Sequence, residues 1–420
     1  MEKSLTHWKA EHPLLFISFN LCIGLFIASQ LAFEHIELSR FYAMAILGVS
    51  LMTYTILTPF IKSTLFVGVF TTLILMSWGI AIYLFTQQYY FFSVPYPSAF
   101  IISCRDWVIQ KLKINIITTE ANSFAQALLL GVKADIDKNL IKAYTQLGII
   151  HIIAISGMHL DILFKNLLRI TNLMPRRKLL RWIELIFILS AVWIYTLMAF
   201  ASPSIVRASL FFSLYMIGNF LGQPRYTLNT IAGGILIIIL FNVYTLQNIG
   251  LQLSYAAVVG IHLFYPLFEK MLPLDNLILK WLWNNLSITM AAQLTTLPIL
   301  LYHFHQISTL VIASNFIIVP LSNLILYGLI LLMLTPGTTI LSRQLGDWIG
   351  QYISMINGWI KYFYDHSIGA PYYMNMTKGQ VGGYYILLLL IYLWMYKVQP
   401  KFLLYSIGLS VLLVMIKLFS

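Results

Sequence analysis

Long apolar runs without a charged residue constrain the possible folds of this chain more than any other feature. Three of them, 13–33, 41–60 and 64–85, follow one another from the N-terminus, and each has about the 20 residues that an α-helix needs to cross a bilayer. Transmembrane β-strands would instead be about ten residues long with alternating polarity. The runs therefore predict a membrane protein built from helices.

The composition agrees with this prediction. Of the 420 residues, 60% are hydrophobic and 10% are charged, whereas a soluble domain carries about 25% charged residues. We therefore expect an all-α fold, a polytopic transmembrane helical bundle of about 10–12 membrane helices with short amphipathic helices at the interface. Further apolar runs lie at 179–201, 204–221, 227–246, 249–266, 286–302, 311–334, 384–396 and 402–419.

The formal net charge of +12 does not by itself indicate a nucleic-acid partner. Six basic residues and no acidic residue lie between positions 165 and 181. Such a cluster is typical of a loop that is held on the cytoplasmic side of the membrane. The chain has two cysteines, which are too few for a disulfide framework.

Changes in polarity along the chain predict four segments. Residues 1–86 hold the N-terminal transmembrane helices, and residues 87–150 form an extracytoplasmic or interfacial amphipathic segment. Residues 151–336 form the transmembrane core, and residues 337–420 hold an amphipathic helix and the C-terminal transmembrane helices.

Three amphipathic helices are expected within these segments. Residues 101–117 place Trp107, Val108 and Leu112 on one side, with Arg105, Lys111 and Lys113 off it. Residues 136–147 place their apolar side chains on one face, with Asp135 as N-cap and Gly148 just past the end. Residues 341–363 would form a helix with an apolar face and, opposite it, a polar face that carries Arg343 and Lys361. We expect this later helix to lie on the membrane surface or beside a wet cavity.

Polar side chains inside apolar segments are costly and point to function. The densest group lies at 151–161, and on a continuous helix its Ser156 and His159 would share one face. This pair would suit an intramembrane serine hydrolase, with Ser156 as nucleophile and His159 as base. The string around Ser156 is similar to the Gly-x-Ser-Gly of rhomboid proteases but lacks the leading glycine, and both side chains would point the same way.

Two other interpretations of the same group remain. A metal site of His151, His159 and Asp161 would require a break, because a continuous helix sets the two imidazoles about 80° and about 12 Å apart. Alternatively, Ser156 and Gly157 allow close helix contact, with the histidines hydrogen-bonded across it. The residues alone favour this packing interpretation, and no metal or cofactor is predicted.

The stretch 151–159 resembles the H-x-x-A-I-S-G-x-H signature of the ComEC family, competence proteins that admit transforming DNA across the bacterial cytoplasmic membrane. Five further strings are similar to family elements in the same order: A-L-L-L-G at 127–131, S-I-V-R-A at 204–208, G-L-Q-L-S-Y-A at 250–256, Q-L-T-T-L-P at 293–298 and N-F-I-I-V-P-L at 315–321. Five matches in order make the resemblance specific.

The resemblance implies a channel, not an enzyme, that passes single-stranded DNA through the bacterial inner membrane as a multi-pass protein. It also implies partners: a ComEA-like extracytoplasmic DNA receptor, a separate nuclease, and a cytoplasmic motor or DNA-binding proteins, besides membrane lipid. Family members commonly carry an OB-like domain, for which residues 87–103 are too short, and many carry a C-terminal metallo-β-lactamase-like domain, for which we expect no counterpart. His303 and His305 lack the Asp-His continuation of a two-metal nuclease.

A polyanion that crosses a bilayer needs a wet path with partial compensation of its charge. Arg207 is the arginine that lies well within an apolar run, where it could meet phosphates or pair with Asp161. For the amides, interhelical hydrogen bonding is the competing interpretation. A small-solute transporter is a further alternative. The candidate path residues are His151, Ser156, Gly157, His159, Asp161, Arg207, Gln252, Ser254, Gln293, Asn315, Arg343 and Lys361.

Overall fold

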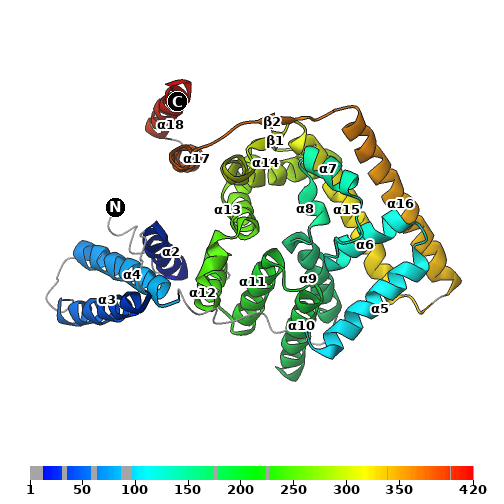
Figure 1. Cartoon of the computed structure of the whole chain (residues 1–420), viewed down its shortest axis with the longest axis horizontal. Coiled ribbons are helices and arrows are strands. Elements are labelled where there is room, and N and C mark those ends of the chain that lie inside the picture. The colour runs from blue at the N-terminus through cyan, green and yellow to red at the C-terminus, as the bar shows by residue number, and fades with distance from the viewer. Residues whose placement is uncertain are drawn as a thin grey trace. The chain divides into compact units, whose positions relative to one another are not determined.

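The computed structural model describes residues 13–30, 36–57, 64–86, 97–173, 178–223, 227–337, 339–397 and 399–419. These residues form helices almost throughout, with one pair of short strands (Figure 1). The all-α prediction is confirmed. Residues 87–96 and 174–177, which hold parts of the predicted interfacial segment and basic loop, lie outside the described residues.

The helices follow one another along the chain as α2 (Pro13–Gln30), α3 (Ile36–Leu57), α4 (Thr64–Thr86), α5 (Ala99–Asn115), α6 (Thr119–Leu130), α7 (Lys138–Gln146), α8 (Ile150–Ile153), α9 (Gly157–Thr171), α10 (Lys178–Met198), α11 (Pro203–Phe220), α12 (Thr227–Phe241), the 3-10 helix η2 (Val243–Gln247), α13 (Ile249–Glu269), α14 (Leu277–Phe304), α15 (Val311–Leu334), α16 (Ile340–Asp365), α17 (Lys378–Lys397) and α18 (Pro400–Phe419). Strand β1 (Gln306–Ser308) pairs antiparallel with β2 (Pro371–Tyr373).

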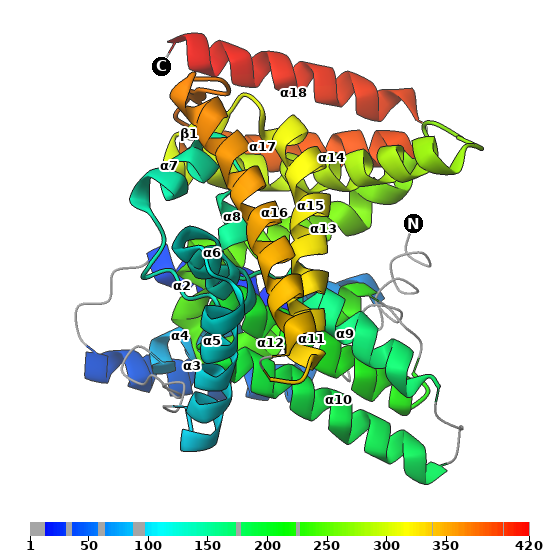
Figure 2. The same ribbon diagram turned by 90° about the vertical axis from the view of Figure 1, so that its right-hand side faces the viewer.

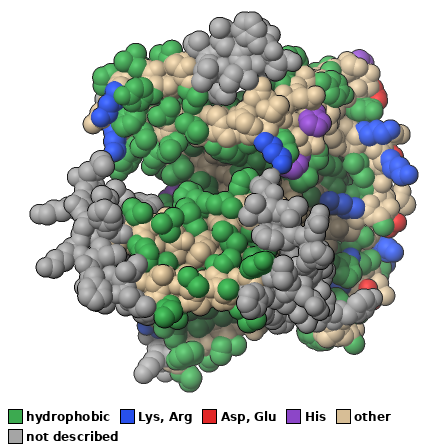
Figure 3. Space-filling view, turned by 60° about the vertical axis from the view of Figure 1, so that its left-hand side comes forward, with side chains coloured by type: hydrophobic (Ala, Val, Ile, Leu, Met, Phe, Trp, Pro, Cys, Tyr) green, Lys and Arg blue, Asp and Glu red, His purple; other side chains and the backbone are tan. Residues whose placement is uncertain are grey.

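Four helices in the described part of the chain, α10, α13, α15 and α17, are long and apolar enough to cross a membrane. Broad areas of exposed hydrophobic side chains cover the face shown in Figure 3. Together with the composition, these features make the chain a membrane protein. The expected total of about 10–12 membrane helices stays a prediction.

The chain divides into two compact units. The first contains residues 1–96, 163–193 and 206–248, and the second contains 97–162, 194–205 and 249–420. The four segments predicted from the sequence stay a prediction.

In the first unit, helices α2 and α4 pack backbone against backbone. A Cβ added at Gly24 would lie 1.9 Å from the carbonyl oxygen of Met76, and one added at Gly79 would lie 2.3 Å from that of Leu21. Only glycine permits such an approach, which is how helices in lipid gain packing without a hydrophobic driving force. The indole of Trp78 donates to Ser50 Oγ at 3.0 Å and joins α4 to α3.

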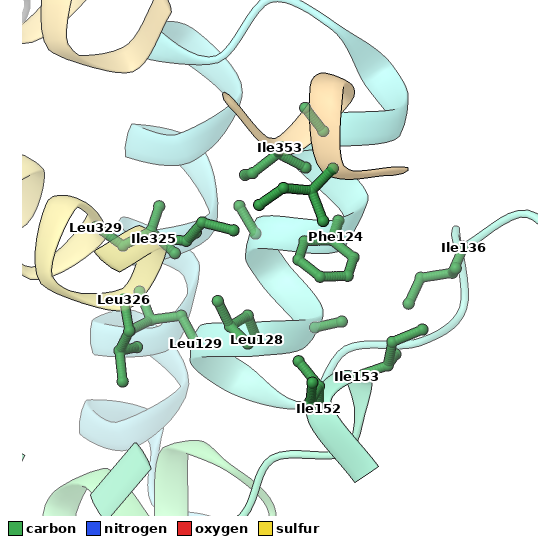
Figure 4. Close-up of a cluster of buried hydrophobic side chains, with 14 of the residues drawn as sticks. Phe124, Leu128, Leu129, Ile136, Ile152, Ile153, Ile325, Leu326, Leu329 and Ile353 are labelled. Atoms are coloured by element: carbon green, nitrogen blue, oxygen red, sulfur yellow. The ribbon is translucent and has the colours of Figure 1, made fainter. Parts of the chain in front are cut away.

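In the second unit, α6 lies at the centre of the largest core. Every residue from Ala121 to Leu130 is buried, and Phe124, Leu128 and Leu129 pack among side chains of α8, α15 and α16 (Figure 4). Its polar residues are paired locally, since Gln126 donates to Asn122 Oδ1 at 2.5 Å. Helix α6 ends at Gly131, whose φ of +72° suits glycine.

Helix α5 places two cations at the C-terminal ends of other helices in this unit. Lys111 Nζ donates to the carbonyls of Met333 (3.0 Å) and Thr335 (2.5 Å) at the end of α15. Arg105 Nη1 donates to Met198 O of α10 at 2.7 Å. Helix C-termini have carbonyls without helical donors and favour positive charge. Lys111 is therefore buried beside Val108 and Leu112, although the sequence pattern placed it off that face.

Helix α16 runs beside α15 (Figure 2) and also packs on α5, α6 and α7. The predicted apolar face, which includes Leu341, Trp348 and Ile356, is buried only in part. Leu341 and Trp348 are 62% and 69% exposed, whereas Ile356 is buried. The buried face is built largely from small and β-branched residues, namely Ser342, Gly346, Ile349, Gly350, Ile353, Ile356, Asn357 and Ile360. A Cβ at Gly346 would lie 2.1 Å from Asn115 O, so close backbone contact decides which face is buried.

Helix α7 confirms the predicted amphipathic helix but not its predicted start, and its place at the membrane surface stays a prediction. It begins at Lys138, and its N-cap is Asp137, whose carboxylate accepts from the backbone N–H of Asn139 at 3.0 Å. Asp135 was expected in that role. Gly148 follows the helix with φ of +72°, as predicted.

Candidate functional site

The signature at 151–159 is a corner between two helices, so the continuous helix on which its geometry was considered is broken. Helix α8 ends at Ile153, and its C-cap residue Ala154 is extended. Helix α9 begins at Gly157, so His151 and His159 lie on different helices. The angle and spacing expected for a straight helix therefore do not apply to this pair.

The side chain of His159 caps the start of its own helix. Ser156 precedes α9 at the N-cap position, and its backbone N–H donates to His159 Nδ1 at 3.0 Å. This contact is the reciprocal half of a capping box, in which a side chain three residues into the helix accepts from the N-cap amide. The Ser-Gly-x-His spacing of the signature follows from that reach.

This contact fixes the protonation pattern of the ring. Nδ1 accepts a hydrogen bond and therefore carries no proton, so the neutral imidazole carries its proton on Nε2, an assignment inferred from the hydrogen bond. A general base for Ser156 needs a free unprotonated nitrogen. His159 has none in this arrangement, which removes the geometric basis of the serine hydrolase interpretation.

The metal interpretation also lacks support within the described residues. They contain no group of three or more His, Cys, Asp or Glu side chains placed to hold an ion. A histidine ligand must offer an unprotonated nitrogen, and the free nitrogen of His159 is the protonated one.

Three of the sequence strings meet at the corner. Ser204 Oγ, at the start of α11, donates to the carbonyl of Ile155 at 3.0 Å. The side chain of Ile155 lies 3.1 Å from where a Cβ at Gly131 would be. The strings at 127–131, 151–159 and 204–208 are thus parts of one structure. Sequence reasoning missed the contact of Ser204, because a serine at a helix start is more often its own N-cap.

The later strings lie on α13, α14 and α15. Gln252 and Ser254 are on α13, Gln293 is on α14, and Asn315 is on α15. Helices α13 and α14 are joined by Thr295, whose Oγ1 donates to Ala256 O at 2.7 Å. A Cβ at Gly260 would lie 2.5 Å from Ala291 O, so these two helices touch through small residues.

Each of two string amides lies five residues before a proline inside its helix, Gln293 before Pro298 and Asn315 before Pro320. Proline has no N–H, so the carbonyl four residues earlier lacks its helical donor. That carbonyl belongs to the residue directly after each amide. Both helices therefore carry a concentration of unpaired polar backbone and side-chain groups at the same place.

Buried polar atoms without a hydrogen-bond partner among the described residues lie both inside and outside the strings. Those inside include Nε2 of His159, Nε2 of Gln293 and Oδ1 of Asn315, and those outside include Oδ1 of Asn284 and Oγ of Ser287. The amide of Asn315 is half satisfied, since its Nδ2 donates to Val311 O at 2.7 Å. A buried unpaired polar group costs about 1–3 kcal/mol. Three of them at string positions indicate sites that take up water or a ligand.

The remaining candidate residues are placed as follows. His151 and Arg343 are exposed, whereas Ser156, Gly157 and Asp161 are half-buried. Arg207 lies on α11 in the first unit, and its pairing with Asp161 stays a prediction. Lys361 is ion-paired with Glu120 at 2.6 Å, a partner that the sequence pattern did not reveal.

Comparison with known proteins adds an independent observation. A family model described as Competence protein matches residues 128–398, more than half of the chain. The chain belongs to the Competence protein family. All twelve candidate residues fall within the matched range, and helices α2, α3 and α4 precede it.

The chain is similar to ComE operon protein 3 of Bacillus subtilis (strain 168). The two are 30% identical over 249 residues, which cover 58% of this chain and 30% of the relative. The match thus spans less than a third of the relative's length. No solved structure matches this chain.

Proposed function

We propose that this protein provides a path by which single-stranded DNA crosses the bacterial cytoplasmic membrane during natural competence. Membership of the Competence protein family supports a role in DNA uptake. The observation that carries the path is the set of buried, unpaired polar atoms on His159, Gln293 and Asn315. Helices that were joined only by dry contacts would pair these atoms with one another.

The chemistry of these groups suits a conduit. Phosphates need compensation in a bilayer, yet a strand that is to be released must be bound weakly at many points. Neutral amides and a neutral imidazole supply hydrogen bonds without the strong charge pairing of buried lysines. Arg207, Gln252 and Ser254 are proposed to continue the path, with His151, Ser156, Gly157, Asp161 and Arg343 around it.

Partners are part of the same proposal. An extracytoplasmic DNA receptor would deliver the strand, a separate nuclease would supply it in single-stranded form, and a cytoplasmic motor or DNA-binding proteins would pull it inward. The setting is the inner membrane, which the protein crosses several times. Catalysis is assigned to those partners, since His159 cannot serve Ser156 as a base in the observed arrangement.

A transformation assay tests the proposal in the source organism. It scores the arrival of labelled DNA at the cell surface separately from its passage through the inner membrane. Deletion of the gene should leave the first unchanged and abolish the second. Inner-membrane passage that persists after deletion would refute the proposal.

Point variants refine this test. We expect Gln293→Leu and Asn315→Leu each to lower inner-membrane passage about ten-fold, because each removes polar atoms from the path at constant helix length. Gln344→Leu is the matched control, since Gln344 is exposed on α16 and lies outside the strings. Membrane abundance is measured for all three.

A further inference from the structure

A hollow lies between the start of α6 and the second half of α16. One of its residues is Lys361, which the sequence predicts as part of the DNA path and which pairs here with Glu120. It encloses about 390 Å³ and is lined by Thr118, Thr119, Glu120, Ser354, Gly358 and Lys361. Small-molecule sites commonly have volumes of about 300–1,000 Å³. All six residues belong to the second unit.

An ion pair forms the polar centre of the hollow. Lys361 Nζ lies 2.6 Å from Glu120 Oε2 and 3.9 Å from Asp137 Oδ2. The side chains of Lys361 and Glu120 are 35% and 37% exposed, so both reach the open space. An exposed ion pair of this kind adds little to the stability of the fold. Stability therefore does not explain why the pair lies inside a hollow.

The carboxylate is held from behind by a buried network. Asn357 Nδ2 donates to Glu120 Oε1 at 3.1 Å, and the hydroxyl of Tyr144 donates to Asn357 Oδ1 at 2.9 Å. Tyr144 is fully buried. Glu120 is therefore fixed in orientation, with its second oxygen directed to Lys361 and the hollow.

The lining and the rim of the hollow differ in polarity. A Cβ added at Gly358, an exposed residue of the lining, would meet no atom within 4 Å, so a larger side chain has room there. On neighbouring turns of α16, Met355, Trp359 and Tyr362 are exposed. Tryptophan and tyrosine gather at the headgroup level of bilayers, so this exposed pair favours a ligand that has a lipid headgroup.

The lining selects among ligands by charge. One ammonium and three hydroxyls suit a phosphate, whereas the fixed carboxylate repels a purely anionic group and suits a cationic one. A phosphoethanolamine headgroup carries both charges, and its primary ammonium can donate hydrogen bonds to Glu120. A phosphocholine headgroup cannot, because its nitrogen bears no hydrogen.

We propose that this hollow binds the headgroup of a phosphatidylethanolamine-type lipid. The phosphate meets Lys361 and the hydroxyls of Thr118, Thr119 and Ser354, and the ammonium meets Glu120. Asp137 keeps Lys361 partly compensated, and the acyl chains lie along Met355, Trp359 and Tyr362. The assignment does not depend on the passage of DNA.

Lipid-dependent thermal stabilisation of the purified full chain in detergent tests the assignment. Dioctanoyl phosphatidylethanolamine should raise Tm by about 2–5 °C. The same concentration of dioctanoyl phosphatidylglycerol or phosphatidylcholine should give less than half that shift. Free O-phosphoethanolamine should give no shift, because it lacks the chains that lie along the rim.

Variants at Gly358 and at the carboxylate complete the test. Gly358→Phe fills the hollow and should abolish the shift, whereas Gly358→Ala, the matched control, should keep it. Glu120→Gln removes the carboxylate and should reverse the preference toward phosphatidylglycerol. This second variant tests the site even if Gly358→Phe does not fold.

Results of three kinds would overturn the proposal. One is an equal shift with all three lipids on the unaltered protein, and another is a full shift with folded Gly358→Phe or an unchanged preference in Glu120→Gln. The third is a shift with free O-phosphoethanolamine equal to that with the lipid, which would assign the hollow to a soluble ligand.

Discussion

At the scale of single residues, hydrogen bonds explain which polar side chains the chain tolerates in an apolar setting. His159 is 1% exposed, and its Nδ1 is satisfied by the amide of Ser156. Lys111 is 6% exposed and is satisfied by two carbonyls at the end of α15. The sequence identified the first as chemically important and missed the second, because no local pattern marks a lysine that caps a distant helix.

The cap formed by His159 predicts a graded response to substitution. His159→Gln should retain stability, because a glutamine oxygen accepts from the N-cap amide as in an ordinary capping box. His159→Leu should lower the free energy of unfolding by about 0.5–2 kcal/mol, the range for a lost cap. Denaturant unfolding of the purified protein measures both. His159→Gln is the matched control, and equal losses in the two variants would argue against the cap.

Lys111 provides a second test at this scale. Lys111→Met keeps the length of the side chain but leaves the carbonyls of Met333 and Thr335 without their donor. A loss of about 1–3 kcal/mol in unfolding free energy is expected, because those carbonyls become unpaired. Lys113→Met, two residues along the same helix at an exposed position, should change stability by less than about 0.5 kcal/mol. A smaller loss at Lys111 than at Lys113 would contradict the capping role.

At the scale of helices, the sequence predicts extent better than orientation. The run 311–334 coincides with α15, and α13 begins at the predicted residue. Helix lengths are predictable because the thickness of the bilayer sets them.

The buried face of α16 was predicted only in part from the sequence, because a pattern of large apolar residues marks the buried face of a helix only in water. In lipid those residues can stay exposed, and small residues such as Gly346 make the helix contacts. The corner at 154–156 was missed because three non-helical residues leave little periodicity to detect.

Two of the three glycines of α16, Gly346 and Gly358, make this orientation testable. Gly346→Ala would place a Cβ 2.1 Å from Asn115 O, so we expect a loss of about 1–3 kcal/mol in unfolding free energy from overpacking. Gly358→Ala meets open space and should be neutral or stabilising by about 0.4–1 kcal/mol, since it reduces the freedom of the unfolded chain. The opposite order of the two variants would mean that α16 is packed through another face.

At the scale of the whole molecule, the family range and the buried polar atoms point to the same part of the chain. The range 128–398 holds all three unpaired string atoms, and no local sequence rule would have singled out His159, Gln293 and Asn315 together. The strings themselves were predictable from the sequence through their resemblance to a family. The contact between these strings at the corner was not predictable from the sequence, because Ser204 and Ile155 are 49 residues apart.

Accessibility to a water-soluble reagent tests the wet path directly. In a background without Cys22 and Cys104, Gln293→Cys and Asn315→Cys should react with a charged thiol reagent, because thiols form the reactive thiolate only where water reaches them. Leu331→Cys is the control, since Leu331 is 53% exposed on α15 and is expected to face lipid. If only Leu331→Cys were labelled, water would reach the face of α15 that carries Leu331 and not Gln293 or Asn315, and the wet path would be contradicted.

The corner between α8 and α9 divides the signature into two stretches that differ in how strictly their number of residues is fixed. The interval from Ser156 to His159 is set by the reach of an imidazole, and one added residue there would turn the ring about 100° away from the amide it caps. The interval from His151 to Ser156 crosses an extended stretch that can lengthen without rotating α9. Insertions should therefore be tolerated before the serine and excluded after it.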